Sequence, residues 1–231
     1  MKVEIWSDIV CPFCFIGKRR FENALQQFAH RPDVEIVWRS FELDPQARTQ
    51  PGASLYQLLA TKYGRPVEWA REMSANMTQS AAELGLRFDF DRAVPANTFR
   101  AHRLVHLAAQ HGRQDAAKER LFRAYLEEGR NVDDAATLTA IGTELGLPEA
   151  EVARTLETDA FAQEVRHDEY QARQIGVRGV PYFVFDDKYA VSGAQPTELF
   201  LEVLEKVWAE RNPLVTLGTD GAACGLDGSV C

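Results

Sequence analysis

Residues 3–14 read VEIWSDIVCPFC, so a short apolar strand leads directly into two cysteines that are separated by two residues. Pro12 suits the first position of a helix, because its fixed φ is helical and its missing N–H would be unpaired there anyway. The N-terminus of that helix favours a thiolate at Cys11, and the thiolate is the reactive form of cysteine. This layout predicts a thiol–disulfide redox site. Half of a zinc site and two inert buried cysteines are the alternatives.

The two cysteines are expected to play different roles. Cys11, at the exposed edge of the helix, is the expected nucleophile. Cys14 lies one turn further in, so we expect it to be more buried, to have a higher pKa and to resolve a mixed disulfide. Phe13 offers a thiolate neither charge nor a polar hydrogen, which predicts a less oxidising couple than a polar dipeptide would give.

The composition limits the classes of function. The chain has 231 residues, of which 45% are hydrophobic and 26% are charged, as in an ordinary soluble globular protein. A net charge of −8 without a basic cluster argues against nucleic-acid binding. No apolar run approaches the roughly 20 residues that span a bilayer. Met1 is followed at once by strand-like sequence rather than by an export signal, so we expect a cytoplasmic protein with no membrane partner.

The order of the expected elements predicts the fold class. The start is β-α-β, with strands at 3–6 and 34–43 around a helix at 15–28, and a right-handed crossover makes such strands parallel. Strands return as a hairpin at 181–185 and 189–192, before an amphipathic helix at 197–211. Helical patterns occupy the middle of the chain, at 55–63, 67–84, 98–111, 116–128, 135–145 and 149–175, the last broken near Thr158.

Without the helical block, this order is that of a thioredoxin-like fold. We therefore predict an α/β protein with a thioredoxin-like fold and a large helical insertion. The first part of the thioredoxin-like domain covers residues 1–50, the insertion 51–175 and the second part 176–211. Residues 212–231 have too few apolar residues in a helical or strand period to pack, so a flexible tail is expected.

Val180 and Pro181 form the second part of the predicted site. A proline that opens a strand after the turn at 176–179 is a position where a cis X–Pro bond can be held. In a thioredoxin-like fold this loop faces the redox motif and leaves the Val180 backbone free to pair with an extended substrate. In such a fold the apolar ring of Pro181 would also be expected to keep metals away from the thiols. Pro12 and Phe13 are the substrate contacts expected from the motif itself.

Four segments carry a resemblance to a known family, namely SDIVCPFC at 7–14, NTFRAHR at 97–103, GVRGVPYF at 176–183 and SGAQ at 192–195. With them the chain resembles the DsbA-type thioredoxin-like oxidoreductases, and more narrowly their cytoplasmic FrnE-like branch. The resemblance spans residues 1 to about 210. It implies a thioredoxin fold with a helical insertion, a cis Pro181 and dithiol–disulfide exchange. No cofactor is expected, and glutathione or a thioredoxin-type protein are the conceivable exchange partners.

Two histidines and four acidic residues also stand out. His102 and His106 have a spacing that can bind metal, but no acidic third ligand is evident, so a packed or solvated helix face is favoured and no metal is expected. The insertion of this family overhangs the site, which places His102 at the border of the substrate groove. A solvated helix face is expected for Asp115, Glu119, Glu127 and Glu128.

Cys224 and Cys231 form a second pair, with six residues between them. This tail is a departure from the general DsbA pattern. One interpretation is a redox shuttle, in which the tail disulfide exchanges with Cys11–Cys14. A local structural disulfide is the second. The third is a four-cysteine zinc site formed with the redox motif, although this spacing is unusual for structural zinc.

The sequence thus predicts a cytoplasmic thiol–disulfide oxidoreductase or protein disulfide isomerase that acts on protein thiols and disulfides, with its oligomeric state left open. Cys11 would form the mixed disulfide and Cys14 would resolve it. One alternative is a glutathione-dependent isomerase or transferase of the related kappa type, which typically has a serine where Cys11 stands. Another is a redox-sensing, chaperone-like binder whose helical groove holds clients.

Overall fold

Four strands form one sheet at the centre of the protein. The computed structural model describes residues 1–211, so the predicted tail and its cysteines, Cys224 and Cys231, lie outside the described residues. The strands β1 (Lys2–Ser7), β2 (Glu35–Ser40), β3 (Tyr182–Phe185) and β4 (Tyr189–Ser192) have the order β2-β1-β3-β4. β1 is parallel to β2, whereas β3 is antiparallel to both β1 and β4. The predicted parallel pair and the late hairpin are both confirmed.

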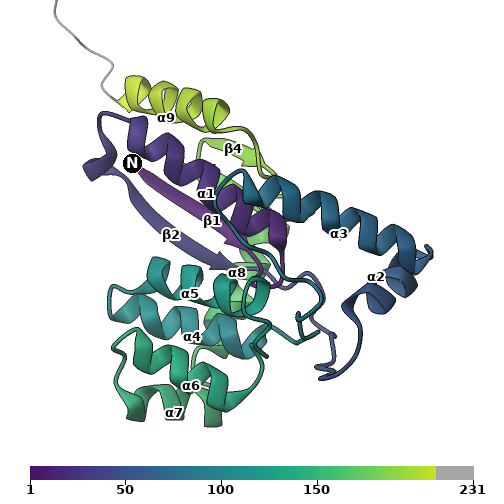
Figure 1. The fold of residues 1–231 in the computed structure, drawn as a ribbon. Helices are drawn as coiled ribbons and strands as arrows, with labels where there is room; N and C mark the ends of the chain where they lie inside the picture. The colour runs from purple at the N-terminus through teal and green to yellow at the C-terminus, as the bar shows by residue number, and fades with distance from the viewer. Residues whose placement is uncertain (212–231) are drawn as a thin grey trace, which may run out of the picture.

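Helix α1 (Pro12–Gln27) carries the redox motif at its first turn and packs on the sheet beside α9 (Thr197–Arg211) (Figure 1). Aromatic residues join these layers. The ring of Phe21 lies 5.5 Å from that of Phe183 and 5.6 Å from that of Phe200, measured between centroids. Such tilted and edge-on pairs add to the free energy of burying large apolar rings. This packing fixes the axis of α1, and with it the position of the first turn.

A short 3-10 helix, Arg31–Asp33, precedes β2. The other α-helices all lie between β2 and β3 in the chain, and they confirm the predicted helical block. They are α2 (Leu55–Tyr63), α3 (Val67–Ala82), α4 (Phe99–Gln110), α5 (Gln114–Leu126), α6 (Ala135–Glu144), α7 (Glu149–Glu157) and α8 (Ala162–Gln174). Figure 1 shows α2 and α3 projecting as a hairpin, while α4 to α7 form a bundle and α8 lies behind the sheet. The predicted break near Thr158 is confirmed, since α7 ends there and Phe161 has a φ of 62° before α8.

Helix α5 attaches the inserted bundle to the sheet. The side chain of Gln114 donates to the carbonyl of Trp38 and accepts from its N–H, both at 2.9 Å. It thereby covers backbone groups of β2, an edge strand whose free N–H and C=O groups would otherwise be open to other chains. The indole Nε1 of Trp38 also donates to Asp115 Oδ1 at 2.9 Å. The bundle is therefore held against the sheet at a defined place.

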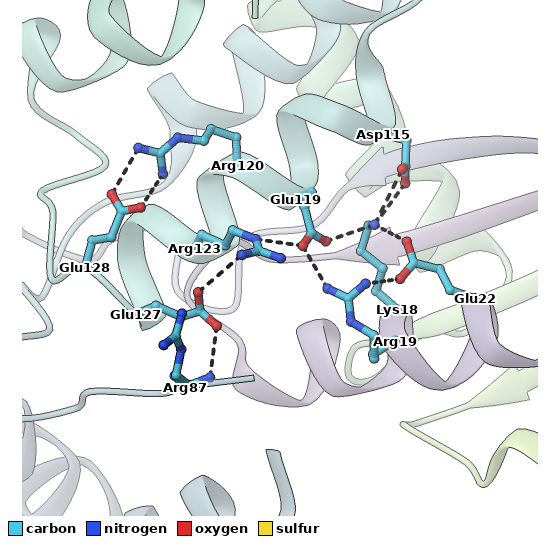
Figure 2. Close-up of polar contacts among 10 residues, drawn as sticks. All are labelled: Lys18, Arg19, Glu22, Arg87, Asp115, Glu119, Arg120, Arg123, Glu127 and Glu128. Carbon is cyan, nitrogen blue, oxygen red and sulfur yellow. Dashed lines mark hydrogen bonds and ion pairs between the residues drawn. The ribbon is translucent and has the colours of Figure 1, made fainter. Parts of the chain in front are cut away.

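A cluster of charged residues joins α5 to the redox helix (Figure 2). Lys18 of α1, only 2% exposed, pairs with Glu22 of its own helix and with Glu119 of α5 at 3.0 Å. Arg19 reaches the same Glu119 at 2.7 Å. The prediction of a solvated acidic face on α5 therefore holds only in part: Asp115 is exposed, but α1 brings Lys18 to Asp115 and both Lys18 and Arg19 to the half-buried Glu119. The periodicity of one helix cannot show this partner.

Candidate active site

Cys11 precedes the first turn of α1, as the motif predicted. It is the N-cap residue, and its N–H donates to the Asp8 carbonyl at 3.2 Å. The N–H of Cys14 donates in turn to the Cys11 carbonyl at 3.1 Å, and both side chains are free thiols. Because the first N–H groups of a helix lack intrahelical acceptors, they carry a partial positive charge that favours an anion at this position.

The segment around Pro181 meets the redox motif from the other end of the chain. The Val180–Pro181 peptide bond is cis, and the Cys11 thiol donates to the Val180 carbonyl at 3.6 Å. Behind them, a Cβ built on Gly17 would lie 2.9 Å from Cγ of Pro181, so α1 approaches this loop as closely as a glycine allows. Cys11, Val180 and Pro181 are therefore brought together, as expected for this fold.

The two thiols are both buried, which corrects the expected exposure of Cys11. Cys11 is 4% exposed and Cys14 is 1% exposed, whereas Phe13 between them is 51% exposed. The reason is the close loop at Val180, which covers the edge of the helix. Burial, followed by the hydrogen bond with Cys11 and its charge, raises the pKa of Cys14 well above its usual value. The predicted difference in burial is small, but the high pKa of Cys14 is confirmed.

Asp8 and His102 form a buried pair behind the motif. Nε2 of His102 lies 3.3 Å from Asp8 Oδ1, and the N–H of Leu43 donates to Asp8 Oδ2 at 2.8 Å. Burial by itself would raise the pKa of Asp8, but these hydrogen bonds outweigh it and hold the pKa below its usual value. Burial lowers the pKa of His102, against the opposing effect of Asp8.

The placement of His102 at the border of the groove is wrong. His102 has no exposed surface, so it cannot touch a substrate in this structure. It lies on the packed face of α4, which the sequence also allowed. His106, one turn on, lies 3.1 Å from both Ser40 Oγ and Asp168 Oδ2. Within residues 1–211 no three histidine, cysteine or acidic side chains are arranged to hold a metal ion.

Lys118 of α5 is a further buried residue at this site, and its place here was not predicted from the sequence. Its side chain is 1% exposed, and Nζ donates to the carbonyl of Ser7 at 3.2 Å. A signal for its burial was present in the sequence. Leu121, Phe122 and Tyr125 follow it at three, four and seven positions, the spacing of a buried helix face. Gly17 and Asp8 were likewise missed, although both stand in or beside the motif.

An open groove of about 640 Å³ lies in front of Cys11. Three large apolar side chains are exposed along it, namely Phe13, Leu43 and Tyr63. Arg48 and Lys62 add positive charge to its lining. The helical hairpin and the loop after it supply most of the apolar wall, with Leu55, Leu58, Leu59, Met73, Met77 and Phe90. A groove of this kind can hold an extended apolar segment against the buried thiol.

Along residues 1–211, none of the helices combines the length and the apolar character that crossing a bilayer requires.

Comparison with known proteins agrees with this geometry. A family model described as the DSBA-like thioredoxin domain matches residues 2–205. A crystal structure of a "probable DsbA oxidoreductase" from Streptomyces coelicolor is 44% identical, with a TM-score of 0.87 over 99% of this chain and 97% of that chain. The Bacillus subtilis protein YwbO, described as uncharacterized, is 28% identical over 201 residues, which are 86% of this chain and 92% of YwbO.

The fold is also shared with a more distant protein. The cytosolic disulfide reductase DsbM from Pseudomonas aeruginosa is 18% identical, with a TM-score of 0.65 over 91% of this chain and all of that chain, a likeness that concerns the fold alone. The family model, in contrast, covers nearly the whole chain, including the redox motif and the loop at Pro181. The protein therefore belongs to the family of DsbA-like thioredoxin-domain proteins.

Proposed function

We propose that this protein is a thiol–disulfide oxidoreductase that acts on protein substrates through Cys11 and Cys14. The observation that carries this proposal is the position of Cys11. Its thiol lies at a helix N-terminus, within hydrogen-bonding distance of the Val180 carbonyl and at the wall of an apolar groove. A thiol placed in this way can meet a disulfide in an extended chain whose backbone runs beside Val180.

The proposed reaction has two exchange steps. The Cys11 thiolate attacks a client disulfide, so that a bond forms between Cys11 and one client sulfur while the other client sulfur leaves as a thiolate. The Cys14 thiolate then attacks Cys11 Sγ, which closes the Cys11–Cys14 disulfide and releases the first client sulfur. Two electrons pass from the protein to the client. The reverse sequence oxidises a client dithiol, and two successive turns in opposite directions isomerise a disulfide.

The groove supports a protein client rather than a small molecule. Exposed apolar side chains are normally few and scattered on a soluble domain. Here Phe13, Leu43 and Tyr63 border one groove that contains the nucleophile. Unfolded or partly folded segments, whose apolar residues are still exposed, are therefore the clients we propose.

We place this activity in the cytoplasm, as expected for the FrnE-like branch. In a reducing compartment the dithiol form of Cys11 and Cys14 prevails, which favours reductase or isomerase work. The protein needs no cofactor in this scheme, and the thiols are reset by glutathione or a thioredoxin-type protein. The name of DsbM places that protein in the cytosol, and one structure of DsbM was solved with GSH.

Trapping of the mixed disulfide tests the proposal. The wild-type protein should reduce insulin disulfides with glutathione as the electron source. As the client we choose reduced, unfolded ribonuclease A whose thiols have been converted to mixed disulfides with an aromatic thiol. Cys14→Ser should accumulate a covalent complex between Cys11 and this client, because the variant lacks the thiol that resolves the mixed disulfide. Cys11→Ser is the matched control and should form no complex. Full insulin reduction by Cys11→Ser would refute the proposed nucleophile. If Cys11→Ser/Cys14→Ser protein prevented the aggregation of an unfolded client as well as the wild type does, a chaperone-like binder would be favoured.

The tail pair, Cys224 and Cys231, is proposed to assist as a redox shuttle. A chain that ends at Asn212 lacks both cysteines but keeps every described helix and strand. If the tail exchanges with the motif, this truncation should slow turnover with glutathione, and disulfide mapping of the full-length Cys14→Ser protein should find a linkage between tail and motif peptides. Equal turnover and an equal redox equilibrium of Cys11–Cys14 in both chains would exclude the shuttle.

A further inference from the structure

Lys118 is buried behind the redox motif without an ion-pair partner among residues 1–211. Burying an ammonium group without a paired anion is unfavourable. The equally buried Lys18 shows the ordinary solution, since it contacts Glu22, Asp115 and Glu119. Lys118 Nζ instead has one hydrogen bond, to the Ser7 carbonyl. Because an unpaired buried ammonium is costly to folding, we look for an anion that forms beside Lys118 only during the reaction.

The groups around Lys118 come from every element packed on it. The aromatic rings of Trp38 and Phe122 lie 5.7 and 5.4 Å from Nζ. The titratable groups that act on the ammonium are Asp8 after β1, Cys11 and Cys14 at the start of α1, His102 on α4 and Asp168 on α8. Of these, Asp8 already accepts from His102 and from the Leu43 N–H. Asp168 already accepts from the Ser40 N–H and pairs with Arg39.

Cys14 is the group that is still short of a counter-charge. Its thiol is 1% exposed, and burial raises its pKa well above the usual value. Of the surrounding anionic groups, a Cys14 thiolate raises the pKa of Lys118 most. The Lys118 ammonium in turn lowers the pKa of Cys14. Burial lowers the pKa of Lys118 to about 8, against the opposing effect of the surrounding anionic groups. The buried Lys118 side chain, held at the Ser7 carbonyl just before the motif, is therefore the counter-charge that the fold offers to a Cys14 thiolate.

We propose that Lys118 is the charge-compensating residue that stabilises the Cys14 thiolate in the resolving step. This inference rests on the proposed exchange at Cys11 and Cys14. Cys14 gives its proton to solvent, and its Sγ attacks Cys11 Sγ of the mixed disulfide. The Cys11–Cys14 bond forms, the bond between Cys11 and the client sulfur breaks, and the client sulfur leaves with the electron pair and takes a proton from solvent. Lys118 is unchanged at the end of the step.

The kinetic test separates the two exchange steps. Reduced protein is mixed with glutathione disulfide, quenched in acid, and followed by mass spectrometry. The rate of attack by Cys11 depends on the concentration of glutathione disulfide, whereas the rate of resolution by Cys14 does not. Lys118→Met should slow resolution about tenfold at pH 7, the effect of raising the pKa of Cys14 by about one unit, and should slow the first step less. Lys118→Arg, which keeps the charge, should restore most of the rate.

The dependence on pH distinguishes a charge from a packing defect. The ratio of the wild-type to the Lys118→Met resolution rate should fall toward one above pH 8, because the wild-type ammonium is then lost. A packing defect would slow both steps alike at every pH. Equal slowing of both steps, or a ratio that does not change with pH, would overturn the proposal. A wild type without any exchange would instead refute the proposed function.

A second measurement needs neither turnover nor a Lys118 variant. In Cys11→Ser/Cys14→Asp protein, where a carboxylate stands in for the thiolate, the titration of Lys118 is followed by NMR of isotopically labelled lysine Nζ and compared with Cys11→Ser/Cys14→Asn. Coupling is reciprocal, so the carboxylate must strengthen proton binding at Lys118 by as much as Lys118 favours an anion at position 14. Identical titration of Lys118 in the two proteins would overturn the proposal even if Lys118→Met does not fold.

Discussion

Gly17 lies so close to Pro181 that a Cβ on its backbone would be 2.9 Å from Cγ of the proline ring and 3.5 Å from the Cα of Ala194. Neither neighbour is the end of a flexible side chain. Helix α1 therefore meets the loops at Pro181 and Ala194 at a point where no side chain fits. The same loops supply the carbonyl of Val180 to Cys11 and that of Ala194 to Arg20. A glycine three residues after the motif thus sets how closely the loop at Pro181 covers the nucleophile.

Gly17→Ala should therefore destabilise the protein even though it improves a helix. The substitution gains about 0.5–1 kcal/mol of helix propensity, while overpacking costs about 1–3 kcal/mol. We expect a net loss of about 1 kcal/mol in the free energy of unfolding, measured by urea denaturation. The loop should also move away from Cys11 and slow the reduction of insulin.

Gly179→Ala is the matched control for this substitution. It lies in the same loop region, but a Cβ there would meet nothing within 4 Å, and its backbone is not in the left-handed region. Its free energy of unfolding should stay unchanged or rise slightly. A Gly17→Ala protein as stable as Gly179→Ala would show that the loop yields without cost.

Lys18 should strengthen the attachment of the inserted bundle to the redox helix. It bridges α1 to Asp115 and Glu119 of α5, and burial opposes its charge while these carboxylates and Glu22 raise its pKa. Lys18→Met leaves three carboxylates close together without their buried cation. Because those carboxylates remain partly exposed, we expect a loss of about 1–3 kcal/mol, less than for a fully buried pair.

The measurement is thermal unfolding of Lys18→Met beside Lys206→Met. Lys206 pairs with Glu210 at 3.8 Å on the surface of α9, so its removal should leave the melting temperature unchanged. Equal melting temperatures of both variants would contradict a structural role for the cluster in Figure 2.

Most of the fold could be predicted from the sequence because its signals are local. The helix at 55–63 and the hairpin strand at 189–192 follow from periodicity and turn residues, and they are found with the same bounds. The strand predicted at 34–43 ends earlier, at Ser40, because Leu43 turns away to donate to Asp8. That bond joins residues 35 positions apart, and no local pattern indicates it.

The site could be predicted only where the motif itself carries the chemistry. The motif cysteines and the loop at Pro181 were found from short segments and from the order of the elements. The contact between Lys118 and Ser7 spans 111 positions, and that between Asp8 and His102 spans 94. Periodicity indicates that Lys118 and His102 are buried but not what they face. Their partners depend on how the inserted bundle docks, which is a tertiary property.

His102 should make the protein less stable in mild acid. Burial holds the pKa of His102 below its usual value of 6.5 in the folded state. As the pH falls below 6.5, the unfolded chain therefore takes up a proton that the folded protein refuses. The free energy of unfolding should decrease with falling pH, by at most about 1.4 kcal/mol per pH unit. His102→Gln, which can still donate to Asp8, should remove this contribution in urea denaturation measured from pH 7 to 5, and an unchanged slope would contradict it.

Glu42 should act on stability in the opposite direction over the same range. Its side chain is buried beside Glu169, with Arg166 as the shared cation, and Oε1 has no hydrogen-bond partner. Burial, against the opposing effect of Arg166, raises the pKa of Glu42 from 4.5 to about 7. Between these values the folded protein binds a proton that the unfolded chain does not, so stability increases as the pH falls from 7 toward 4.5.

The two contributions therefore mask one another in the wild type, and single variants should separate them. Glu42→Gln removes the stabilising proton uptake, so its stability should fall more steeply from pH 7 to 5 than that of the wild type. His102→Gln should show the reverse, a stability that falls less or rises. The double variant should be nearly flat over this range if the two sites act independently. If the free energy of unfolding of Glu42→Gln fell less steeply from pH 7 to 5 than that of the wild type, the effect of Glu42 would have the opposite sign to the one predicted. That result would show that Glu42 is already ionised in the folded protein near pH 5.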